Sequence, residues 1–228
     1  MRTTTSLVIA AALLSGCAPA APAAAPKASA VPTPFCVEAG EGRYADGVLI
    51  LGKGDRGIVA GAQANGGVCQ MLPFAREMAA KGYRVAVFDW KQPYDQAMAA
   101  ATRALVADGA GKVVLGGFSR GALVGLGVAP TLGKEVVGVF SVSGGPSPSE
   151  GFATIESVSG FDGPILLISS EEDRVFPAGT NRRIAAAHNG PETVLMLPGS
   201  LHALSLLDGP DKARVRKALD DFLTSVLR

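Results

Sequence analysis

The sequence is poor in side chains that bind metals and has almost no excess charge. It contains two histidines and three cysteines among 228 residues, too scattered for the ligand spacing of a metal site. The 21 Lys and Arg nearly balance the 20 Asp and Glu, which leaves a formal net charge of +1. Proteins that bind nucleic acid need a basic surface. The sequence therefore predicts no metal, no cofactor and no nucleic-acid partner.

The chain also lacks an apolar stretch of bilayer-spanning length at its start. Arg2 is followed by the apolar residues 7–14, which fall short of the roughly 20 residues that a transmembrane helix needs. This pattern is typical of a secretory signal, and residues 1–16 are interpreted as one. The junction Leu-Ser-Gly-Cys at 14–17 resembles the lipobox of bacterial lipoproteins, which implies a lipid anchor at Cys17. The alternative is an ordinary signal cut after small residues, with Cys17 incidental.

Residues 18–34 (APAAPAAAPKASAVPTP) consist almost entirely of alanine and proline. Prolines interrupt helices, and this segment has nothing with which to bury a core, so 17–34 is predicted to be a tether behind the lipidated cysteine. The residue after Cys17 is Ala18 and not aspartate, which resembles lipoproteins sorted to the outer membrane of Gram-negative bacteria. We therefore expect an exported protein, anchored to the outer membrane and facing the periplasm.

Two cysteines remain beyond the tether, Cys36 and Cys69. In an oxidising compartment such an even pair can form a disulfide. The alternative is that both are small buried hydrophobic residues. The sequence leaves this choice open.

Residues 35–228 fit one domain, in which short apolar segments alternate with helical patterns. The segments are rich in Val, Ile and Leu and apolar on both faces, as expected of parallel strands covered by helices. The expected strands are 48–51, 58–62, 84–89, 112–116, 136–141, 164–169 and 193–197. The expected helices are 69–81, 95–107, 121–132, 178–188 and 211–227. The alternation predicts an α/β fold with a mostly parallel central sheet and helices on both faces.

Three local features refine this prediction. Gly82 is expected to end the first helix, and Asp95 to cap the second, whose Met98, Ala101 and Leu105 share one face. The glycine-rich loop 52–57 lacks the spacing of a phosphate-binding loop and is predicted to be a turn between two strands.

A serine stands at the centre of the pattern Gly117-Phe118-Ser119-Arg120-Gly121. A G-x-S-x-G pattern alone means little in a chain with 29 glycines. Here it follows the apolar segment 112–116 and precedes a predicted helix, the setting in which a sharp turn exposes the serine hydroxyl. Ser119 is therefore the candidate nucleophile.

A candidate acid follows a later strand. Asp173 lies just past the segment 164–169, and Glu171 and Glu172 are the alternatives beside it. Functional groups gather at the carboxyl ends of strands in open α/β sheets, and Ser119 is also expected there.

A candidate base completes the set. His202 lies five residues after the segment 193–197, in a loop without a regular pattern. The other histidine, His188, is expected on the surface at the end of a helix, where a positive charge is favourable. Ser119, Asp173 and His202 are therefore predicted to form a triad, in the chain order of α/β-hydrolases.

From residue 45 to 228 the chain resembles the α/β-hydrolase superfamily, and within it the small lidless serine esterases and dienelactone-hydrolase-like members. The serine turn, the segment Asp-Arg-Val-Phe-Pro at 173–177, the His202 loop and the segment 81–89 carry the resemblance. It implies transfer of an acyl group to water through an acyl-enzyme on Ser119.

The same resemblance implies two donors for the oxyanion. One is the backbone N–H of Arg120. The other belongs to the loop 61–67, where the family usually carries His-Gly and this chain does not. Alignment implies the Ala64 N–H as that donor, with Gln63 as its neighbour.

Only residues 142–163 could form a lid, and they are too few for a cap domain. We therefore expect an open site that accepts small or exposed esters. Cleavage of an amide or thioester by the same triad is the alternative enzymatic reading. The non-enzymatic alternative is a catalytically weak surface lipoprotein that binds a ligand. The altered loop 61–67 favours this alternative. The sequence does not indicate the oligomeric state.

Overall fold

The computed structural model describes residues 32–145 and 155–228, and every structural statement below concerns these residues. The predicted signal peptide, Cys17, most of the tether and part of the segment expected to be too short for a lid lie outside them. None of the helices in the described ranges is both long and apolar enough to cross a membrane.

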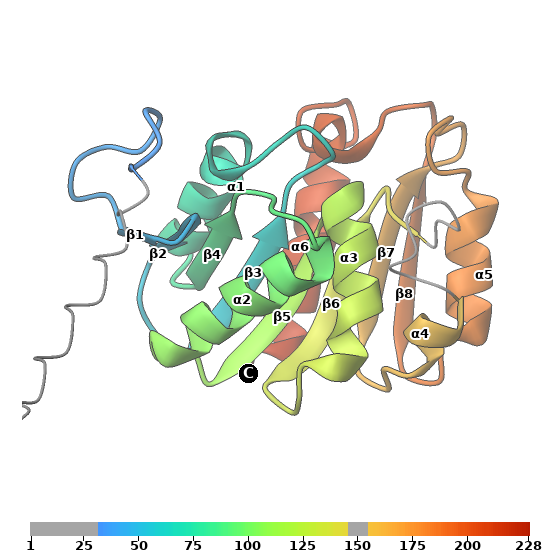
Figure 1. The fold of residues 1–228 in the computed structure, drawn as a ribbon. Coiled ribbons are helices and arrows are strands. Elements are labelled where there is room, and N and C mark those ends of the chain that lie inside the picture. Colours follow the sequence, from blue (N-terminus) through green and yellow to red (C-terminus); the bar gives the residue numbers. More distant parts are fainter. Residues whose placement is uncertain (1–31, 146–154) are drawn as a thin grey trace, which may run out of the picture.

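One eight-stranded sheet forms the centre of the domain, in the strand order β1-β2-β4-β3-β5-β6-β7-β8 (Figure 1). The strands are β1 (Arg43–Ala45), β2 (Val48–Leu51), β3 (Arg56–Gly61), β4 (Arg84–Phe88), β5 (Lys112–Phe118), β6 (Val136–Val142), β7 (Ile165–Ser170) and β8 (Glu192–Leu197). Strands β1 and β2 are antiparallel to their neighbours, and all other pairs are parallel. The predicted mostly parallel α/β sheet is confirmed.

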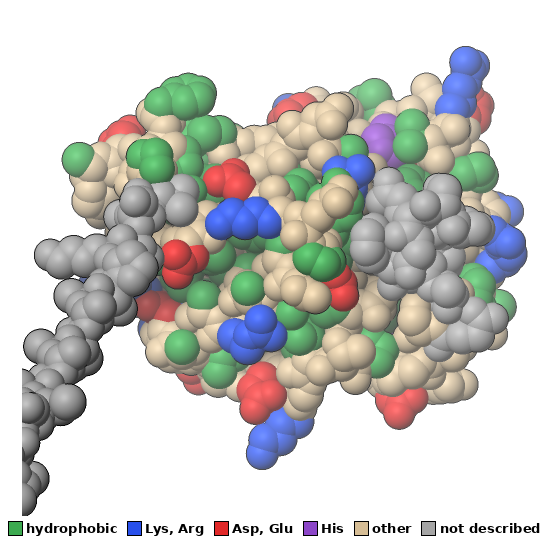
Figure 2. Space-filling model, viewed as in Figure 1, with side chains coloured by type: hydrophobic (Ala, Val, Ile, Leu, Met, Phe, Trp, Pro, Cys, Tyr) green, Lys and Arg blue, Asp and Glu red, His purple; other side chains and the backbone are tan. Residues whose placement is uncertain are grey.

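Helices cover both faces of this sheet. They are α1 (Val68–Ala80), α2 (Tyr94–Ala107), α3 (Arg120–Val128), α4 (Ile155–Ser159), α5 (Gly179–Ala187) and α6 (Lys212–Val226). Helices α1 and α6 share one core with the back of the sheet, while α2 to α5 pack in front of it (Figure 1). The two rear helices are also joined by an ion pair between Lys81 Nζ and Asp220 Oδ1 (2.7 Å). Figure 2 shows acidic and basic side chains interspersed over the front face.

Most helix boundaries agree with the sequence pattern. Gly82 adopts a φ of +86° just after α1, as expected of a residue that ends a helix. Met98, Ala101 and Leu105 form the buried face of α2. Asp95, however, is not the cap: Pro93 occupies that position, and Asp95 lies within the first turn. The loop between Leu51 and Arg56 joins β2 directly to β3, as predicted.

Several short elements were not expected. They are β1, α4 and the 3₁₀ turn η2 (Ala203–Leu207). Three to five residues carry too little periodicity to be recognised from sequence. The third predicted helix also ends early, because Pro130 in the 3₁₀ turn η1 (Ala129–Thr131) follows α3.

The expectation that His188 is a surface residue is wrong. Its side chain stacks on Phe161, with 6.4 Å between ring centres. Its Nε2 donates a hydrogen bond to the carbonyl of Gly163 (2.9 Å), and only 8% of the residue is exposed. The chain between α4 and β7 therefore covers this histidine, a contact that no local pattern reveals.

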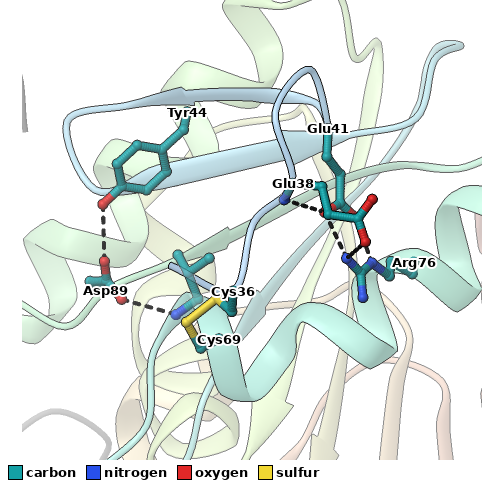
Figure 3. Close-up of a disulfide and its surroundings, with 8 residues drawn as sticks. Cys36, Glu38, Glu41, Tyr44, Cys69, Arg76 and Asp89 are labelled. Carbon is teal, nitrogen blue, oxygen red and sulfur yellow. Dashed lines mark hydrogen bonds and ion pairs between the residues drawn. A yellow bond between two sulfur atoms is a disulfide. The ribbon is translucent and has the colours of Figure 1, made fainter. Parts of the chain in front are cut away.

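A disulfide joins Cys36 to Cys69, and so attaches the first described residues to the start of α1 (Figure 3). An ion pair reinforces this attachment about two helical turns further along α1. Arg76 donates to Glu41 through Nε (2.5 Å) and Nη2 (2.7 Å). This hydrogen-bonded guanidinium lowers the pKa of Glu41, and the carboxylate in turn raises the pKa of Arg76.

Asp89 connects the same N-terminal segment to the end of β4 (Figure 3). Its Oδ2 accepts a hydrogen bond from the hydroxyl of Tyr44 (3.1 Å), and its Oδ1 accepts one from the backbone N–H of Val68 (2.9 Å). Burial and the nearby carboxylate of Asp89 together raise the pKa of Tyr44. Asp89 thus satisfies an N–H group at the start of α1 that the helix itself leaves unpaired.

The disulfide should contribute measurably to stability. Replacing both cysteines with serine (Cys36→Ser, Cys69→Ser) frees a loop with a sequence separation of 33 residues. We expect the free energy of unfolding to fall by about 3–4 kcal/mol, because the bridge restricts the unfolded chain. Urea denaturation measures this, and reduced wild-type protein should match the double variant. Equal midpoints for the variant and the oxidised wild type would contradict the expectation.

Candidate active site

Ser119 lies on the sharp turn between β5 and α3. Its backbone dihedrals are φ +54° and ψ −111°, outside the regions that non-glycine residues normally adopt. Such strain is costly and persists where the surrounding structure enforces it, often at functional sites. The residue is 8% exposed. The backbone geometry matches the sharp strand-to-helix turn predicted from the sequence, but the residue is buried and not exposed as expected.

The glycines on either side of Ser119 have a steric reason to be glycine. A Cβ atom on Gly117 would lie 2.2 Å from the carbonyl oxygen of Gly61, and one on Gly121 would lie 2.0 Å from the same oxygen. Both contacts are with backbone, which cannot move aside as a flexible side chain can. The turn therefore packs directly on the end of β3, and the N–H of Gly121 donates to the carbonyl of Ala62 (3.1 Å).

Asp173 and His202 are brought together at the ends of β7 and β8. His202 Nδ1 donates to Asp173 Oδ2 across 2.8 Å. The other carboxylate oxygen, Oδ1, accepts from the backbone N–H groups of Val175 (2.9 Å) and Phe176 (3.1 Å). The Asp173 side chain is fully buried, whereas 23% of the His202 side chain is exposed. The carboxylate is thus held by its own loop and orients the imidazole.

Phe176 and the two neighbouring glutamates support this pair in different ways. The Phe176 ring stacks on His202, with 6.2 Å between ring centres and 8° between planes. Glu171 and Glu172 are exposed, and it is their backbone N–H groups that donate to the carbonyls of Leu197 and Gly199. They therefore hold the loop after β8, and in this structure Asp173 is the acid that contacts the histidine.

Ser119 reaches the same edge of the sheet from another strand. Only β6 separates β5 from β7, and all three run parallel, so their carboxyl ends meet at one edge. In the described part of the chain no hydrogen bond joins Ser119 to His202. The structure thus joins acid to base and places the serine at the same edge of the sheet, after a strand that β6 separates from β7. Hydrogen bonds at catalytic sites often shorten only when substrate binds.

The loop that follows β3 contains the predicted second oxyanion donor. The N–H of Gly66 donates to the carbonyl of Gln63 (2.9 Å), which closes a turn. Among residues 32–145 and 155–228, the N–H groups of Gln63 and Ala64 have no protein acceptor. Ala64 is exposed and Gln63 half-buried. Both N–H groups remain candidates for binding an oxyanion.

Sequence reasoning missed three side chains near this loop. Trp90 Nε1 donates to the carbonyl of Ala62 (3.2 Å), and Arg120 Nη1 donates to the carbonyl of Ala64 (2.6 Å). The Arg120 guanidinium lies over the ring of Tyr94, 4.5 Å from its centre. Trp90 and Tyr94 follow a strand whose carboxyl end lies at the edge of the site, and this position was the available signal. Within the described ranges no group of three or more His, Cys, Asp or Glu is arranged to hold a metal ion.

Comparison with protein families gives one match. The Phospholipase/Carboxylesterase family matches residues 94–196. This stretch is less than half of the chain and contains Ser119 and Asp173, but it ends before His202 and excludes the loop after β3. No sequence among the curated proteins matches significantly.

Comparison with solved structures gives matches over most of the domain. One is to LipS or LipT, metagenome-derived lipolytic enzymes, with a TM-score of 0.66 and 17% identity, covering 83% of this chain and 99% of the other. A monoacylglycerol lipase of Paleococcus ferrophilus matches with a TM-score of 0.66 and 14% sequence identity. This match covers 78% of this chain and 98% of the lipase chain. A dienelactone-hydrolase-like promiscuous phosphotriesterase from metagenomic libraries matches with a TM-score of 0.61 and 19% sequence identity. This match covers 75% of this chain and 87% of the other.

These similarities agree with the fold observed here. Identities this low establish the shared architecture, while the family match extends the agreement to the sequence around the serine turn. Together these similarities support the interpretation that the protein is an ester hydrolase. The chain has an α/β-hydrolase fold.

Proposed function

We propose that the protein is a serine hydrolase that cleaves small carboxylic esters, with Ser119 as nucleophile, His202 as general base and Asp173 as the group that orients it. The observation that carries the proposal is the strained Ser119 turn at the same sheet edge as the hydrogen-bonded Asp173–His202 pair. The match to the Phospholipase/Carboxylesterase family supports the ester as the bond that is cleaved.

The proposed reaction has two halves. His202 Nε2 accepts the proton of Ser119 Oγ as this oxygen attacks the ester carbonyl, and the resulting imidazolium is stabilised by Asp173. Collapse of the tetrahedral intermediate breaks the bond to the alcohol, which leaves with the proton from His202. Water then attacks the acyl-enzyme with His202 again as base, releasing the carboxylic acid and restoring Ser119.

The oxyanion of each tetrahedral intermediate needs donors aimed at it. In this proposal the Arg120 N–H, immediately after the nucleophile, is one donor. An N–H of the loop after β3, that of Ala64 or of Gln63, is the other. Loss of one such donor typically lowers kcat by roughly 100-fold or more, so the loop makes a large contribution to the rate.

We also propose that the domain is exported and anchored to a membrane through an acylated Cys17, on the sequence argument given above. In the native host we expect metabolic labelling of the protein with a palmitate analogue, and loss of that label in Cys17→Ser. Ala18→Ser serves as the matched control and should keep the label. Equal labelling of wild type and Cys17→Ser would contradict the anchor.

Ser119→Ala tests the nucleophile. The domain without its signal should hydrolyse p-nitrophenyl acetate and react with a fluorophosphonate probe. In Ser119→Ala we expect kcat/KM to fall by roughly a thousandfold or more and labelling to disappear, because the attacking oxygen is gone. Ser225→Ala, on α6 and remote from the site, should behave as wild type.

The same assay tests the size of the substrate. Run over acyl chains from acetyl to lauroyl, it should give the highest kcat/KM at the short end. A rise toward lauroyl would contradict the preference for small esters, and wild-type labelling no stronger than that of Ser119→Ala would contradict the enzyme itself.

Asp173→Asn tests whether Asp173, and not Glu171 or Glu172, is the acid of the proposed triad. An amide at this position no longer stabilises the imidazolium and disfavours the tautomer with the proton on Nδ1, so we expect kcat to fall by roughly 10³- to 10⁴-fold. Glu171→Gln and Glu172→Gln should stay within about twofold of wild type, since their side chains are exposed. If kcat falls more in either glutamine variant than in Asp173→Asn, that glutamate and not Asp173 is the acid of the triad. Steady-state kinetics on p-nitrophenyl acetate provide the comparison.

A further inference from the structure

The side chain of Arg120 reaches away from its own helix. From the first position of α3 it extends to the loop after β3, where Nη1 donates to the carbonyl oxygen of Ala64 across 2.6 Å. The two residues are 56 positions apart in the sequence. The backbone of Arg120 and the loop it contacts are the two sources of oxyanion donors in the proposed function, so one residue connects both halves of the oxyanion site.

An aromatic row supports the guanidinium. Its carbon lies 4.5 Å from the centre of the Tyr94 ring. Tyr94 meets Trp90 edge to face at 5.5 Å, and Trp90 meets Phe88 in the same way at 4.8 Å. A planar guanidinium stacked on an aromatic ring loses little freedom when it forms a hydrogen bond. Arg120 is therefore held in position before any substrate arrives.

The loop is fixed at two carbonyl groups. The carbonyl of Ala62 accepts from the N–H of Gly121 (3.1 Å) and from Trp90 Nε1 (3.2 Å), and the carbonyl of Ala64 accepts from Arg120. Each peptide group is planar, so fixing a carbonyl also fixes the direction of the N–H in the same plane. The Ala62 carbonyl shares its peptide group with the N–H of Gln63, and the Ala64 carbonyl shares its peptide group with the N–H of Asn65. The N–H of Ala64 lies between these two anchored groups, in the peptide group of the Gln63 carbonyl, which accepts from Gly66.

The opposite end of the loop has its own anchor. Asp89 accepts from the N–H of Val68, and a Cβ on Gly67 would lie only 2.3 Å from Asp89 Oδ1. Between Gln63 and Gly67 the loop contains one internal hydrogen bond in the described structure, from the N–H of Gly66 to the carbonyl of Gln63. In the described structure, the Arg120 side chain is thus the contact that fixes the exposed tip at Ala64.

We propose that the Arg120 side chain is a positioning residue, which holds the loop after β3 so that its N–H groups face the oxyanion in a chain without the usual His-Gly. This inference rests on the proposed function, and concerns how that site is held in shape. The donors bind the oxyanion more strongly than the ground-state carbonyl. A residue that positions them therefore stabilises the transition state more than it stabilises the bound ester.

The test compares Arg120→Ala and Arg120→Lys with wild type, all of which keep the backbone N–H of residue 120. With p-nitrophenyl acetate we expect kcat of Arg120→Ala to fall about 10- to 100-fold, approaching the loss of one donor, while KM changes less than about threefold. The rate of fluorophosphonate labelling should fall in parallel. Lysine retains a donor but not the planar stacking, so Arg120→Lys should recover part of kcat.

Two controls separate positioning from general damage. Arg103→Ala removes an exposed arginine from α2 and should keep wild-type kcat. Millimolar guanidinium chloride should restore part of kcat in Arg120→Ala, and none in Ser119→Ala. Thermal unfolding midpoints of all folded variants should agree with wild type within about 3 °C, since the side chain is a surface contact and not core.

The possible results are distinguishable. Wild-type kcat in Arg120→Ala, beside an inactive Ser119→Ala, would overturn the positioning role and leave the proposed function intact. A loss confined to KM would also overturn it, because it would make Arg120 a substrate-binding group. Wild-type protein no more active than Ser119→Ala would overturn the proposed function, and this inference with it.

Discussion

Direct backbone contact between β3 and the turn after β5 is the constraint on which the site depends. The carbonyl of Gly61 lies where any Cβ on Gly117 or Gly121 would be, and a Cβ on Gly61 itself would lie 2.8 Å from the Cα of Gly121. Because this contact has no room for side chains, α3 begins immediately beside the sheet, and the chain must turn within one residue. That residue is Ser119, and its positive φ is the consequence. The same contact brings the loop after β3 beside the first turn of α3, so that Ser119, the proposed nucleophile, and the candidate oxyanion donors are adjacent.

Asp173 and His202, the proposed acid and base, are held by a separate set of contacts. Asp173 is fixed by two N–H groups of its own loop, and the loop of His202 is fixed to the end of β7 by backbone hydrogen bonds from Glu171 and Glu172. The hydroxyl of Ser170 adds a bond to the carbonyl of Leu201 (2.7 Å). The acid–base pair is thus assembled at β7 and β8, and the serine turn at β3 and β5. The parallel sheet is what brings the two assemblies to one edge.

The sequence predicted those features that local composition determines. Buried parallel strands must be apolar on both faces, so β2 to β8 could be located from short Val, Ile and Leu runs, and the strand ends then indicated Ser119, Asp173 and His202. Features that depend on distant contacts were not predictable. His188 is buried because residues before β7 pack over it, and the partner of the Arg120 side chain lies on a loop 56 residues away. Strand β1 is too short to carry a pattern, and its place beside β2 follows from a hairpin.

The central claim is that Ser119 carries the acyl group between the two halves of the reaction. Stopped-flow mixing with p-nitrophenyl acetate, followed by acid quench and peptide mass spectrometry, tests it most directly. The account predicts a burst of about one equivalent of p-nitrophenol when deacylation is slower than acylation, with one acetyl group on the peptide that contains Ser119. Turnover that leaves an acetyl group on another residue, with Ser119 unmodified, would contradict it.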